Sequence, residues 1–149
     1  MINQTEESTN LFSEAFIIQY IEVAQQAIAD DTVKGVIVTS GKPIFMAGAD
    51  LRALLEDITD KKAFTDSLIN LHTGLRSIET GGKPFVAAIN GTALGGGLEV
   101  GLHCHYRTLA STAFTALPEV FLGLVPGWGG ATILPKLIGP ERAVQVIML

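Results

Sequence analysis

Two glutamates stand in apolar surroundings close to glycine-rich or proline-bearing turns, where a carboxyl group could do acid–base chemistry. Glu99 follows three consecutive glycines in "ALGGGLEVG", and Glu119 follows Pro118 in "ALPEVFLGL". Most glutamates are simply solvated surface residues. In an apolar environment, however, the pKa of a glutamate moves away from its ordinary value, and the side chain can exchange protons near neutral pH. Each residue therefore has a surface interpretation and an acid–base interpretation.

The glycines before Glu99 have three interpretations of their own. A strand that turns through Gly95, Gly96 and Gly97 into a helix leaves N–H groups free at the helix N-terminus, where an anion or a developing oxyanion is favoured. The same glycines could instead permit close packing of strand and helix. A phosphate-binding loop is the third interpretation, but the pattern GxxxxGK[ST] is absent and GxGxxG does not occur in the right register.

A second turn of small residues precedes another expected helix. In "FMAGADL", the residues Ala47, Gly48 and Ala49 follow an apolar stretch. Alone, this segment is typical of an ordinary turn between a strand and a helix. Two such turns after neighbouring strands could aim two N–H groups at one point, which is the geometry that an oxyanion hole requires.

The other reactive side chains favour packing over chemistry. His103, Cys104 and His105 are adjacent in the sequence, and side chains one or two positions apart on a helix do not share a face, so no metal site is expected. The patterns GxSxG, CxxC and HExxH are absent, which leaves a catalytic triad or a zinc site without support. Trp128 in "PGWGG" either packs against the edge of the core or lines a ligand tunnel.

Composition limits the class of protein. The 149 residues are 48% hydrophobic and 17% charged, as expected of one globular domain over residues 1–149 with a real core. The net charge of -5 and the scattered basic residues argue against nucleic-acid binding. One cysteine, a polar N-terminus and no long apolar run lead us to expect a cytoplasmic protein without a membrane span.

Hydrophobic periodicity predicts an alternation of helices and buried strands. A helix is expected in residues 11–30 with Ser13 as its N-cap, followed by a strand at 35–40 covered on both faces. Further helices are expected at 51–57, 64–80, 98–107, 131–139 and 141–149, strands at 84–90 and 107–112, and a loop at 114–130. This order predicts an α/β domain of right-handed crossover units. The apolar C-terminal residues 146–149 lack a cap, and we expect further chain to cover them.

Three segments together resemble the crotonase superfamily, the enoyl-CoA hydratase/isomerase fold. They are "FMAGADL", "KPFVAAINGTALGGGLEVGLHCHYR" and "ALPEVFLGLVPGWGGATILPKLIG", and in this order they cover most of the chain after residue 35. The finer resemblance is to the hydratase part of bacterial multifunctional fatty-acid oxidation proteins, in which a 3-hydroxyacyl-CoA dehydrogenase follows. The resemblance implies a spiral of ββα units, assembled as a homo-oligomer.

The resemblance also implies roles for particular residues. The backbone N–H groups of Ala49 and Gly96 would form the oxyanion hole, Glu99 would activate water, and Glu119 would protonate the α-carbon. The positions Ala47, Asp50 and Leu51 fall where the family binds adenine, and Arg52 falls where a basic residue faces the coenzyme A phosphates. The implied reaction is hydration of a fatty enoyl-CoA in β-oxidation, without a metal or a separate cofactor, because coenzyme A is part of the substrate.

The sequence departs from the family pattern at both ends. We expect the family's first strand and its C-terminal helices to be missing, and the commoner "GGTQRLP" is replaced by "GGATILP". Two alternatives to the hydratase are a Δ3-Δ2 enoyl-CoA isomerase, which often keeps only one of the two carboxylates, and a catalytically silent fragment or assembly module. Acyl chain length and oligomer size have no signature in these residues.

Overall fold

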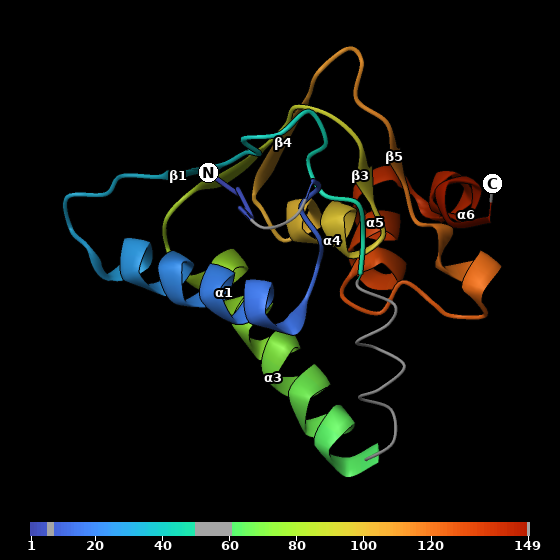
Figure 1. The fold of residues 1–149 in the computed structure, drawn as a ribbon, viewed down its shortest axis with the longest axis horizontal. Coiled ribbons are helices and arrows are strands. Elements are labelled where there is room, and N and C mark those ends of the chain that lie inside the picture. The colour runs from blue at the N-terminus through green and yellow to red at the C-terminus, as the bar shows by residue number, and fades with distance from the viewer. Residues whose placement is uncertain (6–7, 50–60, 149) are drawn as a thin grey trace.

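The computed structural model describes residues 1–5, 8–49 and 61–148 and confirms an α/β architecture (Figure 1). Its main sheet is parallel and has the strand order β1 (Val36–Val38), β2 (Phe85–Ile89), β4 (Tyr106–Leu109). Side chains of β2 alternate between buried and half-buried positions, as a strand with one face on the core requires. The expectation that the strand at 35–40 is covered on both faces is wrong, because Ile37 of β1 is 69% exposed.

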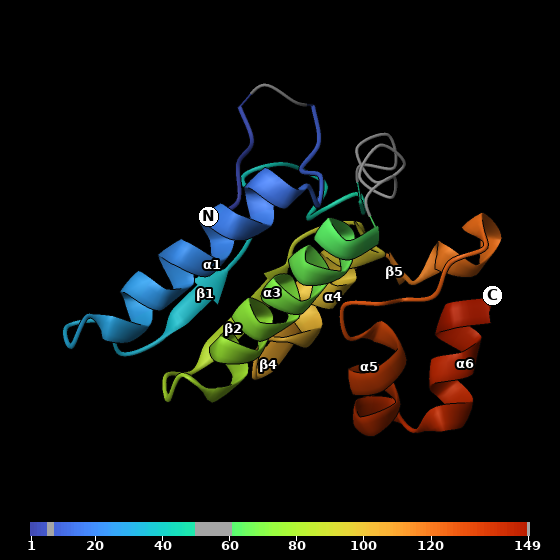
Figure 2. The same cartoon turned by 90° about the horizontal axis from the view of Figure 1, so that it is seen from below.

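Two long helices cover the buried face of this sheet. The helices α1 (Glu14–Ala29) and α3 (Lys61–Thr80) pack against each other and run alongside each other in Figure 2. They approach closely because Gly74 has no side chain: a Cβ atom there would lie 2.3 Å from Cδ1 of Ile21. The predicted cap of α1 is confirmed, since the N–H of Phe16 donates to Ser13 Oγ at 3.2 Å.

A second, two-stranded parallel sheet leads into the short helix that carries the glycine turn. It pairs β3 (Ala93–Leu94) with β5 (Thr115–Ala116), and α4 (Gly96–Leu102) begins directly after β3. The helix expected at 98–107 therefore ends earlier than predicted, and β4 begins at Tyr106. The segment expected to be a loop contains β5 and a 3-10 helix, η1 (Pro118–Leu122).

The last two helices pack against each other on the side of the molecule away from α1 (Figure 2). They are α5 (Gly130–Ile138) and α6 (Pro140–Met148), close to the expected ranges. The N–H of Leu117 donates to the carbonyl of Val146 at 3.3 Å, so α6 is tied to the start of η1. The helix predicted at 51–57 lies outside the described residues. In the described part of the chain, no helix is long and apolar enough to cross a membrane.

Candidate active site

The first glycine turn is held in place by residues near the N-terminus. The N–H of Ala47 donates to the carbonyl of Asn10 at 2.9 Å, and the N–H of Phe12 donates to the carbonyl of Gly48 at 2.7 Å. The side chain of Asn10 is fully buried, and its Nδ2 donates to the carbonyl of Phe45 at 3.1 Å. Gly48 has a φ of +103°, a conformation that favours glycine. The chain path at Ala49 is therefore set by a parallel contact with residues 10–12.

In the second turn, each of the three glycines is required by a different close contact. A Cβ atom on Gly97 would lie 2.6 Å from both the Cβ and the carbonyl oxygen of Met46, and one on Gly96 would lie 2.8 Å from the Phe12 ring. Gly95 has a φ of +51°, and its Cβ would lie 2.9 Å from Oε1 of Glu119. The packing interpretation of the glycines is therefore correct, and it does not exclude an oxyanion site.

The two turns lie against each other, as the sequence predicts for turns that follow neighbouring strands. The N–H of Leu94 donates to the carbonyl of Met46 at 3.0 Å, and a Cβ atom on Gly48 would lie 3.3 Å from the carbonyl oxygen of Leu94. The N–H groups of Ala49 and Gly96 have no acceptor among the described residues, and both residues line one cavity. Two donors are thus available at that cavity, and their role as an oxyanion hole stays a prediction.

Glu99 is fully buried on α4, one turn after the glycines. Its Oε1 accepts hydrogen bonds from the N–H groups of Trp128 and Gly130, both at 2.8 Å, and its Oε2 has no partner in the described structure. Burial raises the pKa of Glu99 to about 7, and the charge of Glu119 adds to this, while the two hydrogen bonds oppose it. The surface interpretation of Glu99 is therefore wrong.

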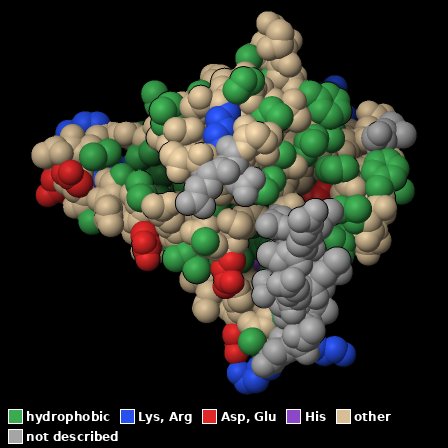
Figure 3. All heavy atoms as spheres, in the orientation of Figure 1, with side chains coloured by type: hydrophobic (Ala, Val, Ile, Leu, Met, Phe, Trp, Pro, Cys, Tyr) green, Lys and Arg blue, Asp and Glu red, His purple; other side chains and the backbone are tan. Residues whose placement is uncertain are grey.

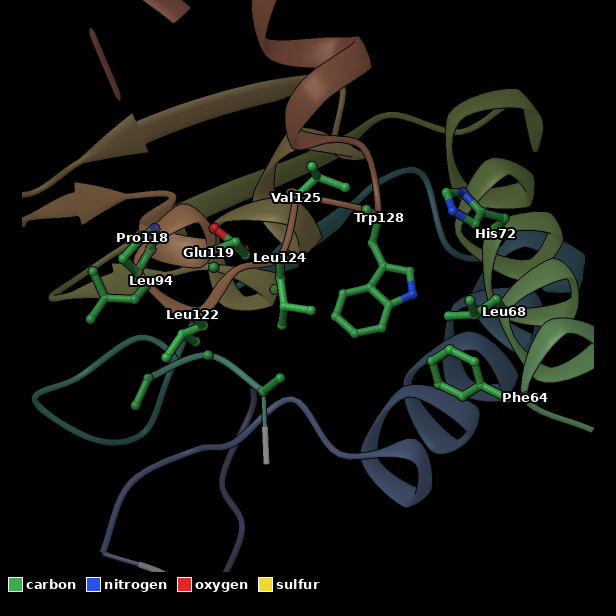
Figure 4. A pocket seen from close by; sticks show the side chains of 16 residues that line it. Phe64, Leu68, His72, Leu94, Pro118, Glu119, Leu122, Leu124, Val125 and Trp128 are labelled. Carbon is green, nitrogen blue, oxygen red and sulfur yellow. The ribbon is translucent and has the colours of Figure 1, made fainter. Parts of the chain in front are cut away.

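Glu119 lies in the first turn of η1 beside the glycine turn, where its Oε1 would be 2.9 Å from a Cβ atom on Gly95 (Figure 4). Burial raises its pKa above the ordinary 4.5, and its Oε2 is a buried atom without a partner among the described residues. Glu119 lines the cavity, whereas Glu99 is not among the residues that line it. The structure thus brings both carboxyl groups close to the same turn, and their division of labour stays a prediction.

The cavity between the turns, η1 and α3 has a volume of about 390 Å³ and is mainly apolar (Figure 4). Trp128 forms part of its wall and packs on the Phe12 ring in a tilted arrangement with ring centroids 4.6 Å apart, so it both packs on the core and lines a ligand-sized space. The lining comprises Ala47, Gly48, Ala49, Phe64, Leu68, His72, Leu94, Gly95, Gly96, Pro118, Glu119, Leu122, Leu124, Val125, Gly127 and Trp128.

A model of the enoyl-CoA hydratase/isomerase family matches residues 2–149 of the chain. The chain belongs to this family. Among solved structures, it is similar to an enoyl-CoA hydratase from Bacillus anthracis, with a TM-score of 0.85, 34% identity, and coverage of 97% of this chain and 56% of that one. An enoyl-CoA hydratase from Geobacillus kaustophilus gives a TM-score of 0.87 at 31% identity, covering 95% of this chain and 54% of that one. The fold is therefore the crotonase fold.

The curated relatives of this enoyl-CoA hydratase/isomerase family member are longer proteins. The fatty acid oxidation complex subunit alpha of Acinetobacter baumannii is 41% identical over 140 residues, which cover 93% of this chain and 20% of the relative. The protein of the same name from Pseudomonas syringae is 41% identical over 142 residues, 95% of this chain and 20% of the relative. The chain spans about one fifth of the length of these relatives.

The sequence also singled out positions for coenzyme A binding and side chains that could bind a metal. Ala47 lines the cavity, whereas Asp50, Leu51 and Arg52 lie outside the described residues. Within the described ranges, no three His, Cys, Asp or Glu side chains cluster as metal ligands would, and the His103 ring instead contacts Glu79 and the Trp128 carbonyl.

Three cavity-lining side chains of α3 were not expected from the sequence. Phe64, Leu68 and His72 follow one another at four-residue spacing and point from α3 towards the cavity (Figure 4). This spacing was visible in the sequence, but it overlaps the stripe of Leu71, Leu75 and Ile78 that packs α3 on the core. The periodicity of apolar residues identifies the helix, but it does not distinguish the face that packs on the core from the face that lines the cavity.

Proposed function

We propose that the chain carries an enoyl-CoA hydratase site, which adds water across the 2,3 double bond of a fatty enoyl-CoA thioester. The observation that supports this most is the pairing of Glu99 and Glu119 near one glycine turn, each with a pKa raised by burial. Hydration moves one proton from water and another to carbon, so a pair of carboxyl groups suits it. A double-bond isomerase moves a single proton between carbons and has less use for two.

In the proposed mechanism, the N–H groups of Ala49 and Gly96 bind the thioester oxygen, because neither donates to another described residue. Glu99 in its ionised form takes a proton from water as the water oxygen forms a bond to C3. The π electrons of the double bond move towards the thioester oxygen, where the two donors stabilise the charge. Glu119 in its protonated form then gives its proton to C2, and a proton passes from Glu99 back to Glu119 to restore the site.

The placement of the carboxyl groups supports this division of roles. A base is useful when its pKa is close to the working pH, and that of Glu99 is about 7. The acid must hold its proton when substrate arrives, and burial favours the protonated form of Glu119. Coenzyme A enters as part of the substrate, and its adenine and phosphates would be held by Ala47, Asp50, Leu51 and Arg52.

The names of the relatives support a place in fatty-acid oxidation, since both are alpha subunits of a fatty acid oxidation complex. We propose that this hydratase acts in the cytoplasm, as a homo-oligomer, in a protein that also carries a 3-hydroxyacyl-CoA dehydrogenase domain. The alternative of a catalytically silent assembly module predicts binding of acyl-CoA without turnover.

Turnover of crotonyl-CoA in water enriched in oxygen-18 tests the proposal. A hydratase yields 3-hydroxybutyryl-CoA with one labelled oxygen, which mass spectrometry detects. A parallel incubation with a 3-enoyl-CoA distinguishes the isomerase, which yields the 2-enoyl-CoA without taking up label. Absence of product from both substrates, with acyl-CoA bound, would favour the silent module.

A further inference from the structure

One buried histidine contacts the loop that binds Glu99. His103 is the C-cap of α4, one turn after Glu99, and is 4% exposed. Its Nε2 lies 2.6 Å from the carbonyl oxygen of Trp128, and its Nδ1 lies 2.5 Å from Oε1 of Glu79 on α3. A carbonyl oxygen can only accept a hydrogen bond, so Nε2 carries a proton and donates it to Trp128.

Both the N–H groups and a carbonyl group of the segment at 128–130 are therefore bound by side chains of α4 and its C-cap. The N–H groups of Trp128 and Gly130 donate to Glu99, while the carbonyl of Trp128 accepts from His103. Gly129 between them has a φ of +126°, and a Cβ atom there would lie 3.1 Å from His103 Nε2 and 2.9 Å from Ile133. This glycine lets successive peptide groups face Glu99 and His103 in turn.

We propose that His103 is a positioning residue for the Glu99 carboxyl group: by holding the Trp128 carbonyl, it aims the N–H groups of Trp128 and Gly130 at Glu99. Glu79 orients the imidazole ring from the other side, and Glu79 itself is paired with Arg76 one turn earlier on α3. The chain of contacts therefore links α3, the C-terminus of α4 and the loop before α5. The catalytic meaning of this role rests on the proposed function, in which Glu99 activates water.

The two N–H donors matter because they are the groups that favour the ionised form of Glu99. Burial and the charge of Glu119 from η1 favour the neutral form, and the hydrogen bonds from Gly130 and Trp128 oppose them. Behind this loop, Glu79 faces His103 and is itself paired with Arg76. A loop that is free to shift would weaken both bonds, raise the pKa of Glu99 and move the carboxylate, and about 1 Å of misplacement can cost about 10²-fold in rate.

Substitution of His103 by glutamine or by asparagine distinguishes the contribution of Nε2 from that of Nδ1. The side-chain nitrogen of His103→Gln reaches about as far as Nε2 and can still donate to the Trp128 carbonyl, whereas His103→Asn reaches only the position of Nδ1. His105→Asn is the matched control, because this exposed ring accepts from the N–H of Phe85 and lies away from the loop. We expect the kcat of His103→Asn to fall about 10- to 100-fold with KM changed less than about threefold, and His103→Gln to recover most of that loss.

If His103 had only a structural role, its substitution would change neither the pH profile of kcat/KM nor the hydrogen exchange of the Trp128 and Gly130 amides selectively. The acid limb of kcat/KM should shift to higher pH in His103→Asn and less in His103→Gln. The Trp128 and Gly130 amides should exchange at least about tenfold faster in His103→Asn, while amides inside α4 keep their protection. Unchanged exchange at Trp128 and Gly130, or equal losses in the Asn and Gln variants, would overturn the proposal.

The exchange measurement does not depend on activity, so it still decides the positioning role if the wild-type protein fails to hydrate crotonyl-CoA. A measurement on the wild-type protein covers the case in which His103→Asn does not fold. Nitrogen-15 NMR should show a proton on Nε2 of His103 that is protected from exchange with solvent. An imidazole protonated only on Nδ1 could not donate to the Trp128 carbonyl and would contradict the proposal.

Discussion

At Glu99, burial and hydrogen bonding act on one carboxyl group in opposite directions, and burial prevails. The side chain has no exposure to solvent, and two backbone donors to Oε1 do not compensate for the loss of water around Oε2. The resulting pKa of about 7 lies well above the ordinary 4.5. A group of this kind lowers the stability of the folded state wherever it must ionise.

The stability of the protein should therefore fall as the pH rises from about 4.5 to about 7. In this range the folded state holds a proton on Glu99 that the unfolded state has released, so the stabilisation present at low pH is lost as Glu99 ionises. Glu99→Gln does not titrate and keeps an oxygen to accept the two bonds. Urea unfolding at pH 5 and pH 8 should show the variant gaining on the order of 3 kcal/mol relative to wild type at the higher pH. An equal difference at both pH values would contradict the burial account.

The sequence alone pointed to Glu99 and Glu119 because a glutamate among leucines, valines and glycines is unusual. It did not point to His103 and Glu79, which are 24 positions apart and come together only when α3 packs near α4. On the helix expected at 98–107, His103 shares no face with Cys104 or His105, which favours packing for all three. The helix ends at Leu102, and the ring turns towards the loop at 128–130.

At the scale of elements, the glycine triplet lets α4 begin directly against the first turn. Gly97 meets Met46 with no room for a Cβ atom, so the N-terminus of α4 and the turn at 45–49 are fixed relative to each other. Gly101 on the same helix is different, because a Cβ atom there would make ordinary contacts of 3.4 Å and 3.7 Å with Ile89 and Ala87.

Gly97→Ala should therefore lower both stability and hydration, whereas Gly101→Ala should not lower stability. The Cβ atom at Gly97 would collide with backbone as well as side chain, and we expect a loss of at least about 1–3 kcal/mol. At Gly101 the added methyl group fits, and alanine is favoured over glycine inside a helix by about 1 kcal/mol. Chemical denaturation of the two variants makes the comparison. Equal stability of the two would show that the contact at Gly97 is relaxed at no cost.

Elements with strong periodicity were predictable, and the irregular ones were not. The helices α1, α3, α5 and α6 match their expected ranges closely, because each has an amphipathic face of at least two turns. The two-residue strands β3 and β5 and the 3-10 helix η1 are too short for any periodicity to identify. They form through pairing with distant segments, such as the parallel contact of Ala93 with Thr115.

At the scale of the whole molecule, apolar side chains gather on the side where η1 and α6 lie (Figure 3). Phe121 is 72% and Val125 is 74% exposed, and Val144 of α6 is also exposed. Monomeric proteins seldom leave large contiguous apolar patches bare. Of the apolar residues at the C-terminus, Met148 is exposed, whereas Val146 and Ile147 pack on the core.

We expect the chain by itself to self-associate through this surface. Light scattering across a range of concentrations should show a mass above the 15.8 kDa of one chain. Phe121→Ser combined with Val125→Ser should reduce the association, whereas a serine at the exposed Ile18 of α1 should not. A monomer at all concentrations with a cooperative melting transition would contradict this expectation.

In the proposed mechanism Glu99 and Glu119 act as a pair, and the hydration rates of their glutamine variants decide whether both carboxyl groups are needed. Glu99→Gln and Glu119→Gln should each lower the kcat for crotonyl-CoA hydration by at least about 10²-fold, with thioester affinity almost unchanged, because acid–base contributions run to about 10²–10⁴. The double variant should be little slower than the poorer single one, and Glu22→Gln on the exposed side of α1 should match wild type. Normal hydration by Glu119→Gln alongside an inactive Glu99→Gln would contradict the pair and leave a mechanism with one carboxylate.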